Sequence, residues 1–343
     1  MSAIKSAEGF YRTVSEKTTS IGPIGYAAQA SSGRIRGFAT NILHDSASIS
    51  TFAKLIRDGI DIVDNSKEIT RMNLRVVATV NALPGLQRSI PLGASVEAIL
   101  PLSRAHTENP EEYIVYIGYN NRVRAVNPSE MSCLMDNVNS AFVYNGNTSY
   151  FKTRLDIVSN MGYTVNVFKN GEIGIVPKML DSASRLLMLT YGYDSESASE
   201  TLVSRENVVA VMIQSGSVVG LCVIESARVP LDGRELKIAE LTDSVISPEH
   251  RTLKVGNDNV KIGSDLYLAL TSYALHDAFS AGEYDVVFSE SNLNKKDSIL
   301  RCCALQGREF HGILPNQAEI YGKLTSLGVF SITPKKISEI LRR

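Results

Sequence analysis

The residues best suited to chemistry lie between Lys237 and Phe279. A strand-like run ends in Ser-Pro-Glu-His-Arg, a polar segment containing glycine follows, and Gly263-Ser264 opens an amphipathic run. A glycine turn between a strand and a helix lets phosphate oxygens approach backbone N–H groups at the positive end of the helix dipole. The sequence therefore predicts an anion site at the amino end of a helix from about Ser264 to Phe279.

Two carboxylates precede this turn on the same predicted strand. Glu240 and Asp243 are three residues apart, so a regular strand would place them on opposite faces. Only one of them could then point into a site beside the strand. Such a carboxylate could accept a proton from a substrate, or it could be a structural group bonded to the neighbouring strand.

The elements around these residues form a clear order along the chain. We expect a strand-turn-strand unit at 163–176 with Asn170-Gly171 at its turn, helices at 180–193 and 195–204, a hairpin at 207–229, and a strand at 237–247. The helix described above follows, and then a strand at 284–291, a helix at 298–306 and a strand region at 307–314.

The first part of the chain has a different composition and pattern. Residues 1–36 are polar and rich in Ser, Thr, Gly and Ala, which predicts an N-terminal arm that a partner subunit or its own body holds in place. Residues 37–145 predict an α+β domain of unassigned function, with one or two helices followed by three strands. The Asn-Gly turn chemistry between Val143 and Arg154 marks the boundary to a second domain at 160–330, and 331–343 is a basic C-terminal tail.

Composition narrows the class of protein. The 343 residues are 44% hydrophobic and 21% charged, as in globular proteins, and the net charge of −1 offers no basic field for nucleic acid. Four cysteines without a C-x-x-C pair, and an N-terminal stretch without an apolar signal region, favour a reduced cytoplasmic setting. No apolar run is long enough to span a bilayer, so we expect no membrane partner.

The order of elements from about Tyr163 to Gly328 resembles the GNAT superfamily of acyl-CoA-dependent N-acyltransferases. The matching residues are Val-Ile-Ser-Pro-Glu-His-Arg at 245–251, Lys-Ile-Gly-Ser-Asp-Leu-Tyr-Leu-Ala-Leu at 261–270 and the final strand-helix-strand. Ser-Glu-Ser-Asn-Leu around Glu290 and the segment 307–323, with Asn316, Ile320 and Gly322, look most like the beta-lysine acetyltransferases. The resemblance implies an α/β fold with a mixed central sheet flanked by helices, preceded by the α+β domain.

Acetyl-CoA is the co-substrate that this resemblance implies, with its pyrophosphate on the glycine turn. The family pattern is Arg/Gln-x-x-Gly-x-Gly/Ala, and two registers, ending at Gly256 or at Gly263, compete for it; both place lysine where the first glycine belongs. Ser264 is a good helix start, which favours the second register with an insertion between Arg251 and Lys261. The cofactor-binding residues predicted in this way are Val245, Ile246, Lys261, Ile262, Gly263, Ser264 and Asp265.

The same resemblance assigns catalytic roles. Glu240 occupies the position of a general base in many members, and Cys303 stands where the family often has an acidic tyrosine; a buried structural cysteine is the alternative. Asp243, Glu290 and Asn292 are predicted to contact the acceptor, a small amine or amino-acid-like molecule. No His or Cys pair stands at ligand spacing, so no metal is expected.

Two functions from different classes fit these observations. The first is N-acyl transfer, most simply N-acetyl transfer, from acyl-CoA to a small amine. The second is a structural or assembly subunit that keeps a degenerate GNAT fold without activity, with the arm mediating a homo-oligomer or a larger protein assembly. A further possibility is that residues up to about Val143 form a second, degenerate copy of the fold, although no internal sequence repeat supports it.

Overall fold

The computed structural model describes residues 18–21, 24–29, 33–39, 41–102, 111–255, 260–281, 284–293, 298–320 and 323–341. The strands are β1 Thr18–Ile21, β2 Ile24–Gln29, β3 Arg34–Ala39, β4 Arg71–Thr79, β5 Ser95–Pro101, β6 Glu112–Asn120, β7 Thr164–Phe168, β8 Val208–Gln214, β9 Ser217–Leu231, β10 Arg234–Ile246, β11 Lys254–Val255, β12 Val260–Lys261, β13 Val286–Asn292, β14 Glu309–Ile320 and β15 Lys323–Ser331. The helices are α2 Ser46–Asn65, α3 Leu83–Ser89, α4 Pro128–Phe142, α5 Thr148–Asn160, the 3₁₀ helix η2 Glu172–Ile175, α6 Pro177–Tyr191, α7 Ser195–Val203, α8 Pro248–Arg251, α9 Gly263–Ala281, α10 Ser298–Leu305 and α11 Pro334–Leu341. No helix among these residues is long and apolar enough to cross a membrane.

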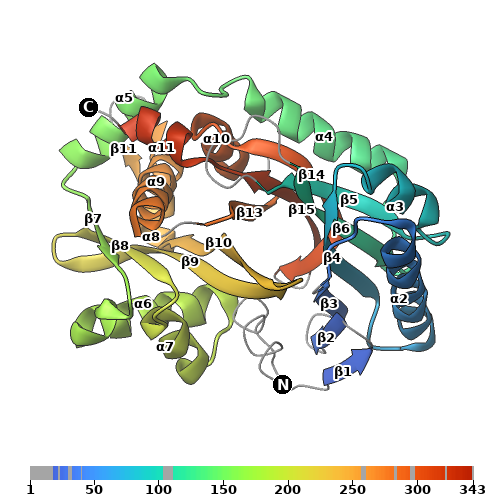
Figure 1. The fold of residues 1–343 in the computed structure, drawn as a ribbon. Helices are drawn as coiled ribbons and strands as arrows, with labels where there is room; N and C mark the ends of the chain where they lie inside the picture. Colours follow the sequence, from blue (N-terminus) through green and yellow to red (C-terminus); the bar gives the residue numbers. More distant parts are fainter. Residues whose placement is uncertain are drawn as a thin grey trace.

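Among the described residues, 13 strands form one large mixed sheet in the order β1-β2-β3-β4-β6-β5-β14-β15-β13-β10-β9-β8-β7 (Figure 1), and β11 and β12 form a separate pair. Helices cover its faces, so the predicted α/β class with a mixed central sheet and flanking helices is confirmed. The predicted arm at 1–36 contains β1, β2 and the start of β3, which belong to this sheet. Residues 1–17 lie outside the described residues.

The two halves of the sheet have the same topology. In the first half β1, β2 and β3 are antiparallel neighbours, β3 is parallel to β4 across helix α2, and β4, β6 and β5 are again antiparallel. In the second half β8, β9, β10, β13, β15 and β14 repeat this order and these directions, with α9 between the parallel strands. Strands β5 and β14 join the halves antiparallel, with Gly312 opposite Ala98. No internal repeat in the sequence had indicated this shared topology.

Each half has its own helical layer and both share a central core. Helices α2 and α3 pack on β3, β4 and β6, whereas β8, β9 and β10 lie between α9 with α5 on one face and α6 with α7 on the other (Figure 1). The shared cluster includes Val77 and Tyr116 from the first half with Ile238 and Phe288 from the second. The sheet is therefore bent so that one face of each half packs against the other.

The central strand and long helix of the second half are placed as expected. Leu266, Leu270, Ala274 and Ala278 recur at helical spacing along α9 and are buried against the sheet. The predicted strand within 171–176 is wrong, because the chain forms η2 there and buries Ile173 beneath α6 and α7. The predicted domain boundary falls at the turn between α4 and α5.

Candidate functional site

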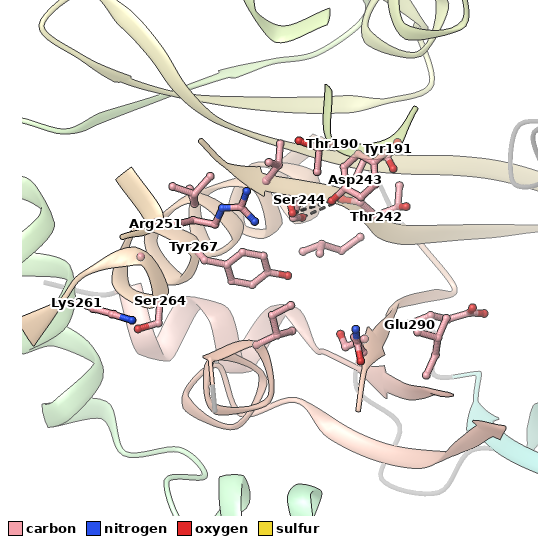
Figure 2. Close-up of a pocket in the computed structure, with 18 residues that line it drawn as sticks. Thr190, Tyr191, Thr242, Asp243, Ser244, Arg251, Lys261, Ser264, Tyr267 and Glu290 are labelled. Atoms are coloured by element: carbon pink, nitrogen blue, oxygen red, sulfur yellow. Dashed lines mark hydrogen bonds between the residues drawn. The ribbon is translucent and has the colours of Figure 1, made fainter. Parts of the chain in front are cut away.

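A pocket opens where the parallel strands β10 and β13 separate. Their last paired residues are Leu241 and Ser289, and beyond this pair the strands diverge. The pocket has a volume of about 490 Å³ and reaches from this gap to the amino end of α9 (Figure 2). Its lining residues are Thr190, Tyr191, Leu241, Thr242, Asp243, Ser244, Val245, Ile246, Arg251, Lys261, Gly263, Ser264, Tyr267, Glu290, Ser291, Asn292, Ile299 and Leu327.

A bulge in β10 shapes one wall of this pocket. Thr242 pairs with Val223 and Val245 pairs with Leu221, so β10 has one more residue than β9 in this interval. Asp243 adopts a left-handed backbone with φ 34°, a conformation that asparagine and aspartate tolerate better than most residues. The expectation of a regular strand at this place is wrong, and the bulge directs Asp243 into the pocket lining.

The amino end of α9 forms the other end of the pocket. Within the predicted insertion between Arg251 and Lys261, the described residues form the antiparallel pair β11–β12, in which Lys254 pairs with Lys261, and the Ile262 N–H donates to the Leu253 carbonyl at 3.2 Å. A Cβ atom at Gly263 would lie 2.6 Å from the Arg251 carbonyl oxygen, so glycine here allows the helix start to pack on the α8 backbone. Of the two registers considered for the family glycine pattern, the one that ends at Gly263 therefore coincides with the start of α9.

Two exposed cations flank this helix end. Arg251 and Lys261 both line the pocket, and neither forms an ion pair with any described residue. Figure 2 shows them with Ser264 on one side of the cavity. Backbone N–H groups in the first turn of a helix have no partner within the helix, so this end of the pocket can bind an anion.

Five of the seven predicted cofactor-binding residues line the pocket: Val245, Ile246, Lys261, Gly263 and Ser264. The other two do not. Ile262 is only 2% exposed and packs in the core beneath α9. Asp265 forms a two-pronged ion pair with Arg154 of α5, with its Oδ2 2.5 Å from Nη2 and its Oδ1 2.7 Å from Nε. Their role is structural, because an apolar side chain faces the core and a paired carboxylate anchors α5.

The three residues predicted to contact the acceptor, Asp243, Glu290 and Asn292, all line the pocket. Asp243 accepts a hydrogen bond of 2.7 Å from the Tyr193 hydroxyl. Glu290 forms a buried ion pair with Arg75 of the first half, at 2.5 Å, with the two side chains 5% and 1% exposed. The first half therefore supplies a direct partner to a residue of this pocket.

The predicted base Glu240 does not line the pocket. It lies on β10 between Glu225 and Phe288, on the face opposite α9, and is partly buried. Burial raises the pKa of Glu240 to about 8, and the neighbouring Glu290 adds to this effect while Arg75 and Arg36 oppose it. The surroundings of Glu240 therefore favour its protonated form in the folded protein.

The predicted acid Cys303 is also outside the pocket lining. It is fully buried in α10, with its sulfur 3.7 Å from the Ser291 hydroxyl. This burial agrees with the alternative of a buried structural cysteine. Two phenols line the pocket, Tyr191 and Tyr267; Tyr267 is the fifth residue of α9, and Figure 2 shows its ring lying across the cavity. Burial raises the pKa of this hydroxyl, so it stays protonated. Its spacing of three residues from Ser264, which places both on one helix face, was the signal that could have revealed it.

Comparison with known proteins gives a fold likeness only. No family model matches the chain, and no curated protein matches it. NAA60 of Arabidopsis thaliana in complex with a bisubstrate analogue is 12% identical, with a TM-score of 0.37 over 49% of this chain and 98% of that one. Ribosomal-protein-alanine N-acetyltransferase from Brucella melitensis is 18% identical, with a TM-score of 0.36 over 50% and 99%. A GNAT-family acetyltransferase from Streptococcus pneumoniae is 15% identical, with a TM-score of 0.35 over 49% and 98%. At such identities the activity has to be inferred from the site.

Proposed function

We propose that this chain is an acyl-CoA-dependent N-acyltransferase that transfers an acetyl group to a small amine. The observation that carries the proposal is the pocket that joins a cationic helix end to a gap between separated parallel strands. The pyrophosphate of CoA would bind the first turn of α9 with Arg251 and Lys261. Separated strands release backbone N–H and C=O groups from their ladder, and these groups can bind the amides of the pantetheine arm.

The chemistry needs a neutral amine, a polarised thioester and a proton for the departing sulfur. We assign the last role to the Tyr267 hydroxyl, because it is a protonated donor that lines the pocket. Asp243 and Glu290 at the other end can accept the amine proton, directly or through water. Glu240 does not line the pocket, which leaves it unsuited to accept this proton directly.

The beta-lysine acetyltransferase resemblance stays a prediction. Asn316, one of the residues that carried it, has a structural part here: its side-chain amide donates to the Arg124 carbonyl at 3.0 Å and so links the two halves. Gly322 lies outside the described residues. The alternative of an inactive assembly subunit also stays a prediction, and CoA binding separates it from the enzyme.

Calorimetric titration with CoA and acetyl-CoA tests the proposal. We expect both ligands to bind the unmodified protein. The double variant Arg251→Gln, Lys261→Gln should bind each about tenfold or more weakly, because a hydrogen bond to a charged group contributes about 1.5–3 kcal/mol. Tyr267→Phe should instead lower turnover while CoA affinity changes little.

The matched control is Lys254→Gln. Lys254 is an exposed cation of β11 that does not line the pocket, so its loss should leave CoA affinity within about twofold, given the weak effect of an exposed charge. Absence of CoA binding to the unmodified protein at millimolar concentration would reject the enzyme and leave the assembly subunit as the better account.

A further inference from the structure

A buried arginine lies behind the place where β10 and β13 separate. Arg308 follows α10 and is only 1% exposed. Its Nη1 donates to the Ser289 hydroxyl at 2.6 Å, and its Nε donates to the side-chain oxygen of Gln306 at 2.8 Å. Ser289 belongs to the last residue pair between β13 and β10, so the guanidinium adjoins the point at which the pocket opens.

Arg308 has no counter-charge in the part of the chain that the structure describes. Both of its hydrogen-bond partners are neutral, no described carboxylate forms an ion pair with it, and its Nη2 has no hydrogen-bond partner there. The buried Arg71 and Arg75, by contrast, each pair with a glutamate. A buried cation without a partner loses its hydration uncompensated, which lowers stability. Such a charge is suited to a place where negative charge develops during a reaction.

Tyr267 is the pocket residue on which this charge acts. Burial raises the pKa of the Tyr267 phenol, and the positive charge of Arg308 opposes this rise. The other titratable groups that act on the phenol are three neighbouring thiols, which add to the rise: Cys303, Cys222 and Cys302. Arg308 is therefore the group that favours the ionised form of this phenol against its surroundings.

A chain of buried hydrogen bonds fixes Arg308 relative to Tyr267. Gln306, which accepts from Arg308, donates through its Nε2 to the Thr271 hydroxyl at 2.9 Å. The Thr271 hydroxyl in turn donates to the Tyr267 carbonyl oxygen at 2.8 Å. Gln306 and Thr271 are both fully buried, so the arginine is held against the turn of α9 that carries Tyr267.

We propose that Arg308 is a positioning residue for acyl transfer that acts through Tyr267: its charge stabilises the phenolate formed when Tyr267 protonates the CoA sulfur. This inference rests on the proposed function. The amine nitrogen attacks the thioester carbonyl carbon, a C–N bond forms, and the C–S bond breaks with its electron pair on sulfur. Sulfur takes the Tyr267 proton. The amine nitrogen loses one proton to solvent, and the phenolate takes one from solvent, which balances the reaction.

A titration of residue 267 tests this role without a need for activity. Tyr267→3-nitrotyrosine introduces a phenol that is more acidic than tyrosine and whose phenolate absorbs visible light, so its ionisation is followed by absorbance in the full chain. Arg308→Gln in this background should move the midpoint to higher pH by about one pH unit or more, because a nearby opposite charge is lost. Arg308→Lys, which keeps a positive charge, should move it less. An unchanged midpoint in Arg308→Gln would overturn the inference.

Arg301→Gln is the matched control. The Arg301 guanidinium lies on the rings of Tyr144 and Tyr150, 4.4 Å and 4.8 Å from their centroids, and the residue does not line the pocket. Its loss should leave the midpoint within about 0.3 pH unit, because its charge is held away from the phenol. If Arg308→Gln does not fold, Arg308→Met takes its place in the titration. Failure of both variants to fold would assign Arg308 to the core and reject the inference.

A kinetic cycle connects the titration to the reaction. Release of the CoA thiol from acetyl-CoA is measured with butylamine as the acceptor in the unmodified protein, Arg308→Gln, Tyr267→Phe and the double variant. Arg308→Gln should lower kcat about tenfold or more and leave the KM for acetyl-CoA within about twofold. In the Tyr267→Phe background the same change should cost less than about twofold, because its effect passes through the phenol. Equal losses in both backgrounds contradict the inference.

These measurements separate the inference from the proposed function. If CoA binds and the midpoint does not move, the acyltransferase proposal survives and the inference fails. If CoA binds but butylamine is not acetylated, the titration alone decides the inference. If CoA does not bind, the proposed function fails, and the role of Arg308 in acyl transfer fails with it.

Discussion

At the scale of single residues, Glu240 and Asp243 are three positions apart in the sequence, but their carboxyl groups lie in different surroundings. Asp243 sits in a bulge at the edge of the pocket, and Glu240 lies on the regular part of the strand facing the other half of the molecule. Burial and the charge of Glu290 raise the pKa of Glu240, whereas Arg75 and Arg36 moderate the rise. The consequence is a proton retained in the folded protein.

Glu240→Gln should change how stability depends on pH. The folded protein keeps the Glu240 proton to a pH of about 8, and the unfolded chain releases it near the ordinary value of 4.5. The folded state binds more protons in this window, so the free energy of unfolding contributed by Glu240 is full below pH 4.5 and is lost as the pH rises through 8. Urea denaturation at pH 5 and at pH 8.5 measures the fall in the free energy of unfolding between these two pH values. This fall should be smaller for the variant than for the unmodified protein by about 1 kcal/mol or more, since one pKa unit is worth about 1.4 kcal/mol.

The comparison requires an exposed carboxylate. Glu235→Gln, on the same strand with a half-exposed side chain, should follow the unmodified protein across the pH range. A Glu240→Gln variant with the same pH dependence as the unmodified protein would mean that Glu240 is ionised in the fold.

At the scale of elements, the equivalent helix starts of the two halves differ. Helix α2 is capped by its own Asp45, whose carboxylate accepts from the Ser48 N–H at 2.8 Å. The Asp45 carboxylate therefore occupies the position at the helix end where a phosphate would bind. Helix α9 begins instead with Gly263-Ser264, flanked by Arg251 and Lys261. The halves therefore share a topology, while only the second has an open cationic helix end.

Gly263→Ala should destabilise the protein. An added Cβ would lie 2.6 Å from the Arg251 carbonyl oxygen and 2.9 Å from its Cα. These are backbone atoms that cannot rotate away, so we expect a loss of about 1–3 kcal/mol in the free energy of unfolding, measured by urea denaturation.

Gly174→Ala provides the control for this change. The nearest atom to a Cβ there is a Val203 methyl at 3.4 Å, an ordinary contact, so its effect should stay within about 0.5 kcal/mol. A Gly263→Ala protein of unchanged stability with weakened CoA binding would contradict this packing role and show that the glycine serves the approach of phosphate.

At the scale of the whole molecule, the halves act as one body. They share one sheet through β5 and β14 and one core that contains Tyr116 and Phe288. Arg75 passes between these rings, 4.6 Å and 5.4 Å from their centroids, to reach Glu290. The first half thus stabilises the wall of the pocket. The sequence alone had suggested no role for this part of the chain.

Arg75→Met should be severely destabilising. Removal of one partner leaves the Glu290 carboxylate buried without its counter-charge, which typically costs about 3–5 kcal/mol. The double variant Arg75→Met, Glu290→Gln should recover part of this loss, because the stranded charge is gone. Urea denaturation of the single and double variants measures both effects.

An exposed pair gives the comparison for this cycle. Arg228 and Glu235 are each half exposed, and Arg228→Met should cost less than about 1 kcal/mol. Equal small losses for Arg75→Met and Arg228→Met would show that the pair between the halves contributes little.

The sequence by itself predicted the elements around the candidate site and the helix end at which an anion would bind. Helical spacing of apolar residues and turn chemistry predicted α9, β10 and β13, and a glycine before a helix start predicted the anion-binding end, since these depend on neighbours in the chain. Tertiary structure decided which side chains meet there. The bulge that redirects Asp243, the burial that protonates Glu240 and excludes Cys303, and the approach of Arg75 to Glu290 across 215 positions arise from contacts between distant segments. Local patterns carry no record of such contacts, because burial and charge depend on the partners that folding brings together.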